Sequence, residues 1–438
     1  MRRMSWIAIA AAIFAMPLRA QQKVKSQAAP EQPDNAVLMQ KIRDLEDRII
    51  AMEGQIRQLK GQPATGQSAA IQKADVQAAV TTSPQTAVAS TPSQATAASN
   101  APASEAIALG GAGGSSSKAL NPDISVTGDF IGVAGHNPVQ YSPSLQMHES
   151  EVGLQAILDP YARGDFFLSF GENGVNLEEG YITFTALPAG LVARAGKMRT
   201  AFGKVNTLHN HALTWADRPL VTNNLAGGED GISDAGLSVQ RILPAPKGIF
   251  LELTGQLFRG DSADVFTASA KNDVSAVGHL RTYKDLSEST NLDLGFSYAR
   301  GHNDLGSNFL TRLYGVDSTV RWKPLRRSIY HSFVLRSEFI WSQRQQLPFE
   351  QRAFGLYTSV DYQLGRRWFV GGRYDRSGRN RLANTTDTGG SIVLTYWPSE
   401  FSLVRGQYRF TRYAGNIDTH ELLMQVLFSL GAHGAHPF

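Results

Sequence analysis

The sequence predicts an all-β protein: a 16-stranded antiparallel transmembrane β-barrel that follows an N-terminal coiled-coil helix and a disordered linker. Three observations lead to this fold class. An export signal opens the chain, a heptad pattern comes next, and residues 121–438 consist of segments of about ten residues that alternate apolar with polar side chains. Because such strands have one apolar and one polar face, they suit a barrel with lipid outside and water inside.

Residues 1–20 have the three parts of a secretory signal peptide. The apolar run 6–16 lies between Arg2 and Arg3 on one side and the small residue Ala20 on the other. This run is well short of the about 20 residues that a membrane helix needs. We therefore expect an exported chain without a membrane helix. The absence of cysteine excludes disulfides, thiolate metal sites and cysteine nucleophiles.

Apolar residues then recur four and three positions apart, with charged residues between them. The seam consists of Leu38, Ile42, Leu45, Ile49, Met52, Ile56 and Leu59. This spacing predicts a periplasmic coiled coil at 35–60, and the alternative is an amphipathic helix that packs on another surface. Residues 61–120 are mostly Ala, Ser, Thr, Gln, Pro and Gly, so they cannot bury enough apolar surface to offset the entropy of ordering. They are predicted to be a low-complexity linker.

Sixteen segments read as strands of an outer-membrane barrel. They are 124–134, 146–158, 161–170, 176–187, 191–200, 234–243, 249–259, 273–283, 289–300, 311–323, 329–343, 352–364, 366–375, 389–398, 402–413 and 419–430. An even number leaves both ends of the barrel on the periplasmic side, as a periplasmic coiled coil requires. Residues 121–438 are accordingly predicted to form the barrel domain.

The connections between these segments alternate in length, as expected for short periplasmic turns and long external loops. The short ones are 159–160, 188–190, 244–248, 285–288, 324–327, Gly365 and 398–401. The longer ones include 201–233, 260–272, 301–310 and 376–388, and 171–175 is an exception to the alternation.

The connection 201–233 is by far the longest, and a loop of this length within a compact fold is usually functional or disordered. By architecture we expect it to fold into the barrel and narrow a pore. Its candidate constriction residues are Lys204, His209, His211, Trp215, Asp217, Arg218, Glu229 and Asp230. The alternative is a solvent-exposed flap that filters nothing.

Counting from the apolar face of each strand predicts which charged side chains point inward. The candidate pore wall consists of Arg194, Arg281, Arg321, Arg336, Arg373, Arg405, Arg409, Glu252, Glu338 and Asp361, and the same count also places Glu149, Glu151, Glu179, Asp317 and Asp375 inside. Because both signs occur, opposed basic and acidic walls are as compatible with the pattern as one-sided selectivity. The alternative is a set of paired charges that fill a polar interior.

His209 and His211, with Asp217 near by in the sequence, are residue types that also bind Zn²⁺. Their spacing is not diagnostic, so we expect pore-lining histidines and no metal or cofactor. His433 and His436 near the C-terminus have the same status.

No catalytic motif occurs in the chain. There is no Gly-x-Ser-x-Gly, His-Glu-x-x-His or P-loop sequence, so no enzyme is expected. A nucleic-acid partner is not expected either. Residues 121–438 hold 30 basic and 30 acidic side chains, so the net charge of +4 arises entirely from the residues before them. The last amphipathic strand with Phe428, or the terminal Phe438, is a candidate signal for the barrel-assembly machinery.

Three stretches carry a family resemblance: 151–161, the segment 166–171, and 196–203, in which Gly-Lys is followed by Phe-Gly before the long loop. They resemble the porin O/P (phosphate-selective porin-like) superfamily of outer-membrane proteins. The resemblance implies a homotrimer with the long third external loop inside the pore. The arginine ladder and lysine cluster of phosphate selectivity do not occur as a run in 201–233.

The expected function is therefore an outer-membrane porin with a water-filled channel for passive diffusion of small polar or anionic solutes. Its expected partners are outer-membrane lipid, two further copies of the chain, the barrel-assembly machinery and the solute. The alternative is a non-conducting structural tether that links the envelope through the coiled coil.

Overall fold

A computed structural model describes residues 122–171, 174–262 and 264–431. The predicted signal peptide, coiled coil and linker, together with His433, His436 and Phe438, lie outside these residues. No helix among the described residues is long and apolar enough to cross a membrane.

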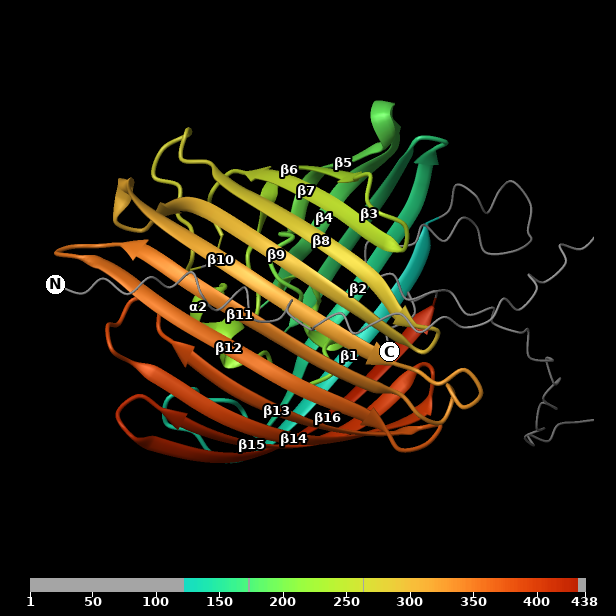
Figure 1. Cartoon of the computed structure of the whole chain (residues 1–438). Coiled ribbons are helices and arrows are strands. Elements are labelled where there is room, and N and C mark those ends of the chain that lie inside the picture. Colours follow the sequence, from blue (N-terminus) through green and yellow to red (C-terminus); the bar gives the residue numbers. More distant parts are fainter. Residues whose placement is uncertain (1–121, 172–173, 263, 432–438) are drawn as a thin grey trace, which may run out of the picture. The chain divides into compact units, whose positions relative to one another are not determined.

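The described chain forms a closed antiparallel barrel of 16 strands, which confirms the predicted fold class (Figure 1). Each strand pairs with its neighbours in sequence, and β1 closes the ring by pairing with β16. The strands are β1 Asp123–His136, β2 Leu145–Asp159, β3 Ala162–Gly171, β4 Gly174–Leu187, β5 Leu191–Arg199, β6 Ser233–Ile242, β7 Ile249–Phe258, β8 Ser275–Ser287, β9 Thr290–Asn303, β10 Gly306–Trp322, β11 Phe333–Gln345, β12 Glu350–Gln363, β13 Trp368–Gly378, β14 Thr386–Ser399, β15 Ser402–Tyr413 and β16 Ile417–Gly431.

Closure satisfies the backbone hydrogen bonds of the first and last strands. The register runs without a break from Ser125 opposite Gly431 to His136 opposite His420. Because a bilayer offers no water to an open sheet edge, such closure is what a sheet needs in order to span one.

Side chains alternate between the two faces of the barrel, and β16 shows the pattern clearly. Leu422 and Leu430 are 57% and 61% exposed on the outer face, whereas Glu421 and Gln425 are only 2% and 1% exposed on the inner face. The two-residue period of a strand therefore sorts apolar side chains outward and polar ones inward.

Aromatic side chains gather in two bands on the outer face. One band lies near the short turns and contains Trp322, Trp368, Phe401 and Phe428, and the other lies farther along the strands and contains Tyr298, Tyr314, Trp341 and Tyr408. Rings lie close together in both bands: the ring centroid of Trp368 lies 4.6 Å from that of the adjacent Tyr396, and those of Tyr298 and Tyr314 lie 5.3 Å apart. An apolar belt between two aromatic girdles is typical of membrane barrels.

The expected external loop at 301–310 is much shorter in the structure. Strands β9 and β10 continue through it, and only residues 304 and 305 separate them. The turn forms because Leu305 N donates to Asn303 Oδ1 at 3.0 Å and Gly306 adopts a φ of +112°. A side-chain turn closed by Asn and a glycine in the left-handed region leaves no need for a longer connection.

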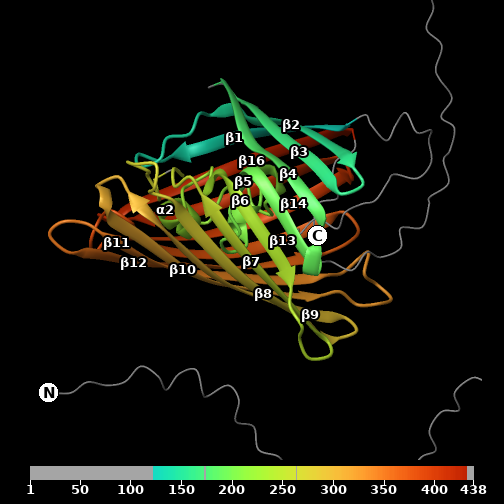
Figure 2. The same ribbon diagram turned by 90° about the horizontal axis from the view of Figure 1, so that it is seen from above.

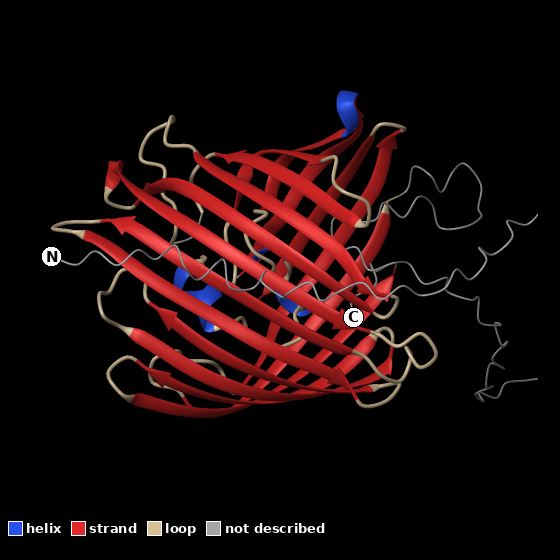
Figure 3. Ribbon diagram, in the orientation of Figure 1, coloured by secondary structure: helices blue, strands red, loops and turns tan. Residues whose placement is uncertain are grey.

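The long connection between β5 and β6 is not structureless. We call residues 200–232 the inner loop, and it contains the 3₁₀ turns η2 Val205–Thr207 and η3 Asn210–Ala212 and the short helix α2 Leu220–Leu225. Figures 1 and 2 show α2 inside the ring of strands, and Figure 3 shows the same helix in blue among them. The third 3₁₀ turn, η1 Pro188–Gly190, instead connects β4 to β5.

Candidate functional site: the inner loop and the barrel wall

Asn206 joins the two ends of the inner loop. Its Nδ2 donates to the carbonyl oxygens of Thr200 and Ile232, both at 3.0 Å, and its Oδ1 accepts from Ile232 N at 2.7 Å. The side chain is buried, so these hydrogen bonds replace those it would make with water. The loop therefore leaves and re-enters the wall at one fixed point.

Arg218 braces the loop from within. Its guanidinium donates to Asn210 Oδ1 at 2.7 Å, to the Val205 carbonyl at 3.1 Å and to the Leu208 carbonyl at 2.6 Å. Burial, together with the charge of Arg199, lowers the pKa of Arg218 to about 9. The structure thus places this predicted constriction residue inside the loop, where it fixes the loop's shape.

An apolar core lies beneath the loop on the inner face of the barrel. It includes Phe202, Val205, Leu213, Val221, Leu225 and Ile232 from the loop and Phe258, Val277, Leu313, Ile340 and Tyr357 from the wall. Helix α2 packs against β11, β12, β13 and β14. Burial of these side chains holds the loop against the wall with the same driving force as any protein core.

The first part of the loop is hydrogen-bonded to β7, β9 and β11. Ala201 N donates to Gln256 Oε1 at 2.7 Å, and Gly203 N donates to Ser297 Oγ at 2.9 Å. Val205 N donates to Glu338 Oε2 at 3.3 Å. The predicted wall residue Glu338 therefore serves as an attachment point for the loop.

Lys204 is the cationic side chain of this part of the loop. Its Nζ lies 3.6 Å from Asp293 Oδ2, and the side chain remains 21% exposed. Burial lowers the pKa of Lys204 to about 8, with further lowering by Arg321 and Arg281, although Asp293 acts in the opposite direction. The charge of this lysine is thus sensitive to pH values slightly above neutral.

Asp217 attaches the middle of the loop to β13 and β15. Its carboxylate accepts hydrogen bonds from Arg373 at 3.0 Å, Arg409 at 2.9 Å and Gln407 at 2.6 Å. Burial alone would raise the pKa of Asp217, but the two guanidinium groups hold it well below its usual range. Trp215 completes this contact, because the Arg373 guanidinium lies 5.0 Å from its ring centroid.

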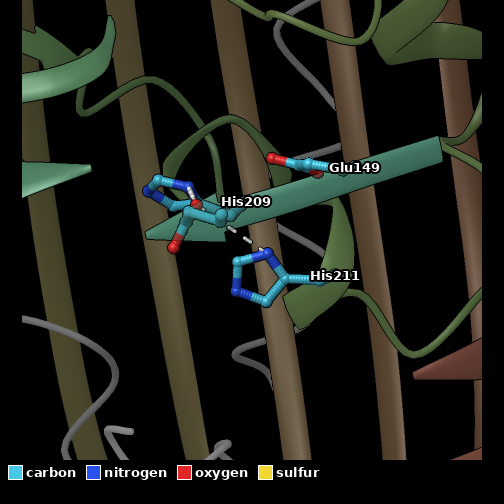
Figure 4. Close-up of side chains that lie close together, drawn as sticks. Glu149, His209 and His211 are labelled. Carbon is cyan, nitrogen blue, oxygen red and sulfur yellow. Dashed lines mark ion pairs between the residues drawn. The ribbon is translucent and has the colours of Figure 1, made fainter. Parts of the chain in front are cut away.

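A cluster of carboxylates on β2 and β4 surrounds His209. Its Nδ1 lies 2.6 Å from Glu151 Oε2 and 3.1 Å from Glu178 Oε2, and its Nε2 lies 3.2 Å from Glu179 Oε2. Burial acts to lower the pKa of His209, but the three carboxylates raise it well above its ordinary value. His211 Nδ1 lies 3.8 Å from Glu151 Oε2. Figure 4 shows the rings of His209 and His211 close together.

Asp217 therefore does not join the two histidines, although it is close to them in sequence. The partners of the histidines come instead from β2, where Glu149 and Glu151 point inward. Glu229 is 62% exposed, and the imidazole of His148 lies 3.8 Å away and lowers the pKa of the Glu229 carboxyl. Asp230 is exposed, and its backbone carbonyl accepts a hydrogen bond from Arg199 at 2.8 Å.

The candidate wall residues differ in how they are paired. Arg281 donates to Asp293 at 3.0 Å, Arg405 donates to Gln425 at 2.6 Å, and Glu252 accepts from Gln240 at 2.6 Å. Further contacts on the wall are Arg336 with Asp361, Arg373 with Asp375, Arg409 with Glu421, and Arg194 over the ring of Tyr181. Most of these side chains therefore have a partner on the wall itself.

The inner face of the barrel carries charges of both signs, and their distribution differs between its parts. On β1 to β4 the buried acidic residues are Asp129, Glu149, Glu151, Asp165 and Glu178. On β8 to β15 buried arginines and buried carboxylates occur together, and these are Arg281, Arg344, Arg373, Arg405 and Arg409 with Asp293, Asp317, Glu338, Asp375 and Asp387. All the buried arginines of this set therefore lie on a part of the wall that also carries buried acidic groups.

No protein-family model matches the sequence. An uncharacterized protein of Aquifex aeolicus (strain VF5) is 27% identical over 392 residues, covering 74% of this chain and 81% of the relative. Among solved structures, a loop L8 deletion mutant of OmpT, an outer membrane protein of Vibrio cholerae, covers 71% of this chain and 100% of its own at a TM-score of 0.51 and 11% identity.

Two further structures have slightly lower scores. The anion-selective porin from Comamonas acidovorans covers 70% of this chain and 98% of its own, with a TM-score of 0.49 and 11% identity. The outer membrane channel DcaP of Acinetobacter baumannii covers 71% and 96%, with a TM-score of 0.48 and 12% identity. The chain thus shares the barrel fold of the Vibrio cholerae outer membrane protein.

Proposed function

We propose that the protein is a porin of the bacterial outer membrane, in which small polar or anionic solutes diffuse passively through the barrel. The observation that carries this proposal is the inner loop, which lies inside the barrel and is fixed to β7, β9, β11, β13 and β15. A loop held on several sides of the wall narrows the lumen to a defined opening, which is what size selection requires.

Placement in the outer membrane is supported by the surface of the barrel and by its fold. An apolar belt with two aromatic bands covers the outside, and charged side chains lie inside. The fold similarity to an outer membrane protein of Vibrio cholerae agrees with this placement. A homotrimer is part of the proposal because of the porin resemblance of 151–161 and 196–203.

The preference for polar solutes is supported by the charged interior. Buried carboxylates lie on β1 to β4, and buried arginines lie together with carboxylates on β8 to β15. A lumen lined by charged and polar groups disfavours apolar solutes. The arginines in turn offer hydrogen-bond donors to carboxylate or phosphate groups.

Conductance across a planar bilayer tests the channel directly. In salts of unequal ion mobility we expect stepwise openings in groups of three, together with a measurable reversal potential. A folded, heat-modifiable barrel that gives no openings would favour the structural tether instead. Openings that never occur in threes would contradict the proposed trimer but would still support a channel.

The charge of Lys204 predicts a pH dependence of ion selectivity. The lysine faces Asp293, Arg281, Arg321 and Asp317, and its pKa of about 8 means that it carries a proton at pH 7 and loses it at pH 9. Because a fixed positive charge in a lumen favours anions, we expect the anion-to-cation permeability ratio to fall about twofold across this range. Reversal potentials measured between pH 6 and pH 9.5 check the expectation.

A substitution separates Lys204 from the other groups that titrate in the lumen. Lys204→Gln should abolish the change near pH 8, whereas Lys247→Gln, in the exposed turn between β6 and β7, should leave it intact. An unchanged pH profile in Lys204→Gln would show that another group is responsible.

A further inference from the structure

Four side chains from two distant parts of the chain bring potential metal ligands to one place. Glu149 and Glu151 are two residues apart on β2 and therefore share its inner face, and His209 and His211 come from the inner loop. One ligand atom from each of the four residues can be chosen such that all lie within 4.8 Å of one another. Figure 4 shows Glu149 with the two histidines.

Glu149 gives a second observation that points to a ligand. The residue is only 5% exposed, yet neither of its carboxylate oxygens accepts a hydrogen bond from any described residue. A buried carboxylate without donors carries a large desolvation cost, which proteins avoid by pairing the charge or by metal coordination. A cation at this point would supply the missing partner.

The carboxylate of Glu151 and the ring of His209 are in direct contact at the centre of the cluster. Glu151 Oε2 and His209 Nδ1 lie 2.6 Å apart, and neither atom makes a hydrogen bond of acceptable angle with a described residue. A carboxylate oxygen and an imidazole nitrogen that meet without a satisfied hydrogen bond are both donor atoms that Zn²⁺ accepts.

The other ring nitrogen of His209 is held as it is in metal sites. His209 Nε2 lies 3.2 Å from Glu179 Oε2 and forms a hydrogen bond with it. Histidines that bind a metal through one nitrogen usually donate the other N–H to a carboxylate, which fixes the ring orientation and the tautomer. Glu179 therefore orients His209 for a ligand on its Nδ1 side.

The net charge around the cluster also favours a divalent cation. Glu149, Glu151, Glu178 and Glu179 contribute four negative charges, and Arg199 and Arg218 are the arginines whose charges act on Glu178 and Glu149. Two negative charges remain when these arginines are counted. A divalent ion balances them without a proton on His209.

We propose that Glu149, Glu151, His209 and His211 form a site for one divalent transition-metal ion of the Zn²⁺ class, which ties the inner loop to β2. A donor set of imidazole nitrogens and carboxylate oxygens suits such ions, whereas Mg²⁺ and Ca²⁺ prefer oxygen ligands alone. The site goes beyond the proposed channel function, since it depends on the contact between loop and wall and not on conductance.

The competing explanation is a shared proton. In that case Glu149 is protonated and donates to Glu178, and no metal binds. The two explanations predict different effects of Glu149→Gln, because an amide can replace a protonated carboxyl but is a poor ligand for Zn²⁺. A proton-sharing Glu149 therefore predicts an undiminished affinity for Zn²⁺, or none from the start.

Zinc binding to the purified full-length protein in detergent tests the proposal. The protein is prepared without a polyhistidine tag and with His433→Ala and His436→Ala, because tail histidines could bind zinc themselves. After removal of metal with a chelator, Zn²⁺ alone is titrated by calorimetry, and Co²⁺ absorption reports the donor set. We expect one ion per chain and Co²⁺ bands of a four- or five-coordinate nitrogen and oxygen site.

Matched variants locate the site. Glu149→Gln and His211→Ala should each weaken zinc binding at least about tenfold, and Glu151→Gln serves if one of them fails to fold. Glu252→Gln and His279→Ala, which change a buried glutamate and a largely enclosed histidine elsewhere on the wall, should bind as the parent does. Absence of zinc binding in the parent, or an affinity unchanged in Glu149→Gln and His211→Ala, would overturn the proposal.

Discussion

Replacing Asp217 with asparagine should release the middle of the inner loop from the barrel wall and lower the free energy of unfolding by about 2 to 3 kcal/mol. Asp217 meets Arg373, Arg409 and Gln407 at once. An amide keeps the size of the side chain and one acceptor oxygen but loses the negative charge, so the two buried guanidinium groups are left with a single neutral acceptor between them. Asp375 and Glu421 remain as partners of these arginines, which limits the loss.

The deficit should be the same at pH 7 and pH 5. The pKa of Asp217 is depressed, so its stabilising contribution is complete above the ordinary value of 3.8 and is lost only as the pH falls through the lower value in the folded protein. Equilibrium unfolding in urea at the two pH values measures this. Single-channel conductance should also rise in the variant, because a released loop obstructs less of the lumen.

Asp264→Asn is the matched control. Asp264 is 91% exposed and lies 3.3 Å from Arg381, so its loss should cost no more than about 0.5 kcal/mol. If both variants unfold alike, Asp217 is not an attachment point. If Asp217→Asn is destabilised but its conductance is unchanged, the loop stays in place through its apolar core.

The strands could be predicted because each strand has its own alternating pattern of apolar and polar residues. A strand between lipid and water needs one apolar face, so this pattern can be recognised in each segment without knowing which strands it pairs with. All sixteen predicted segments overlap the observed strands β1 to β16. The ends are less accurate, as at 301–310, because the turn there depends on a local hydrogen bond from Leu305 to Asn303.

The path of the inner loop could not be predicted in the same way. Its length predicts that it lies inside the barrel, but its path depends on contacts between residues far apart in the sequence. Proximity in the sequence groups Asp217 with His209 and His211, whereas its partners Arg373 and Arg409 are over 150 residues away. Sequence spacing carries no information on which wall a loop residue reaches.

The cluster around His209 could not be predicted for a related reason. Alternation places Glu149 and Glu151 among the inward candidates, and His209 is among the loop candidates, but nothing in either pattern pairs them. The folded path of the inner loop is what places His209 against β2. The sequence analysis also missed Asn206, which is one of four asparagines in the inner loop and has a side chain of the kind that often bonds backbone groups in loops.

Among glycine-to-alanine substitutions in the inner loop, which each add one methyl group, Gly203→Ala should lower the free energy of unfolding the most. Gly203 has a φ of +63°, which costs a residue with a side chain about 1 kcal/mol. A Cβ atom here would also overlap Oε1 of Glu338 and lie 2.7 Å from its Cδ. Glu338 is buried and holds Val205 N, so it cannot turn away without losing that hydrogen bond. We expect a total loss of about 2 to 4 kcal/mol in unfolding free energy.

Gly228→Ala separates the two contributions within the same loop. Gly228 has a φ of +70° and no atom within 4 Å of an added Cβ, so it should lose only the conformational cost of about 1 kcal/mol. A double-mutant cycle then identifies the overlap, because Gly203→Ala in a Glu338→Ala background should cost no more than Gly228→Ala does. Equal costs of Gly203→Ala and Gly228→Ala in the parent would mean that Glu338 moves freely and does not fix the start of the inner loop.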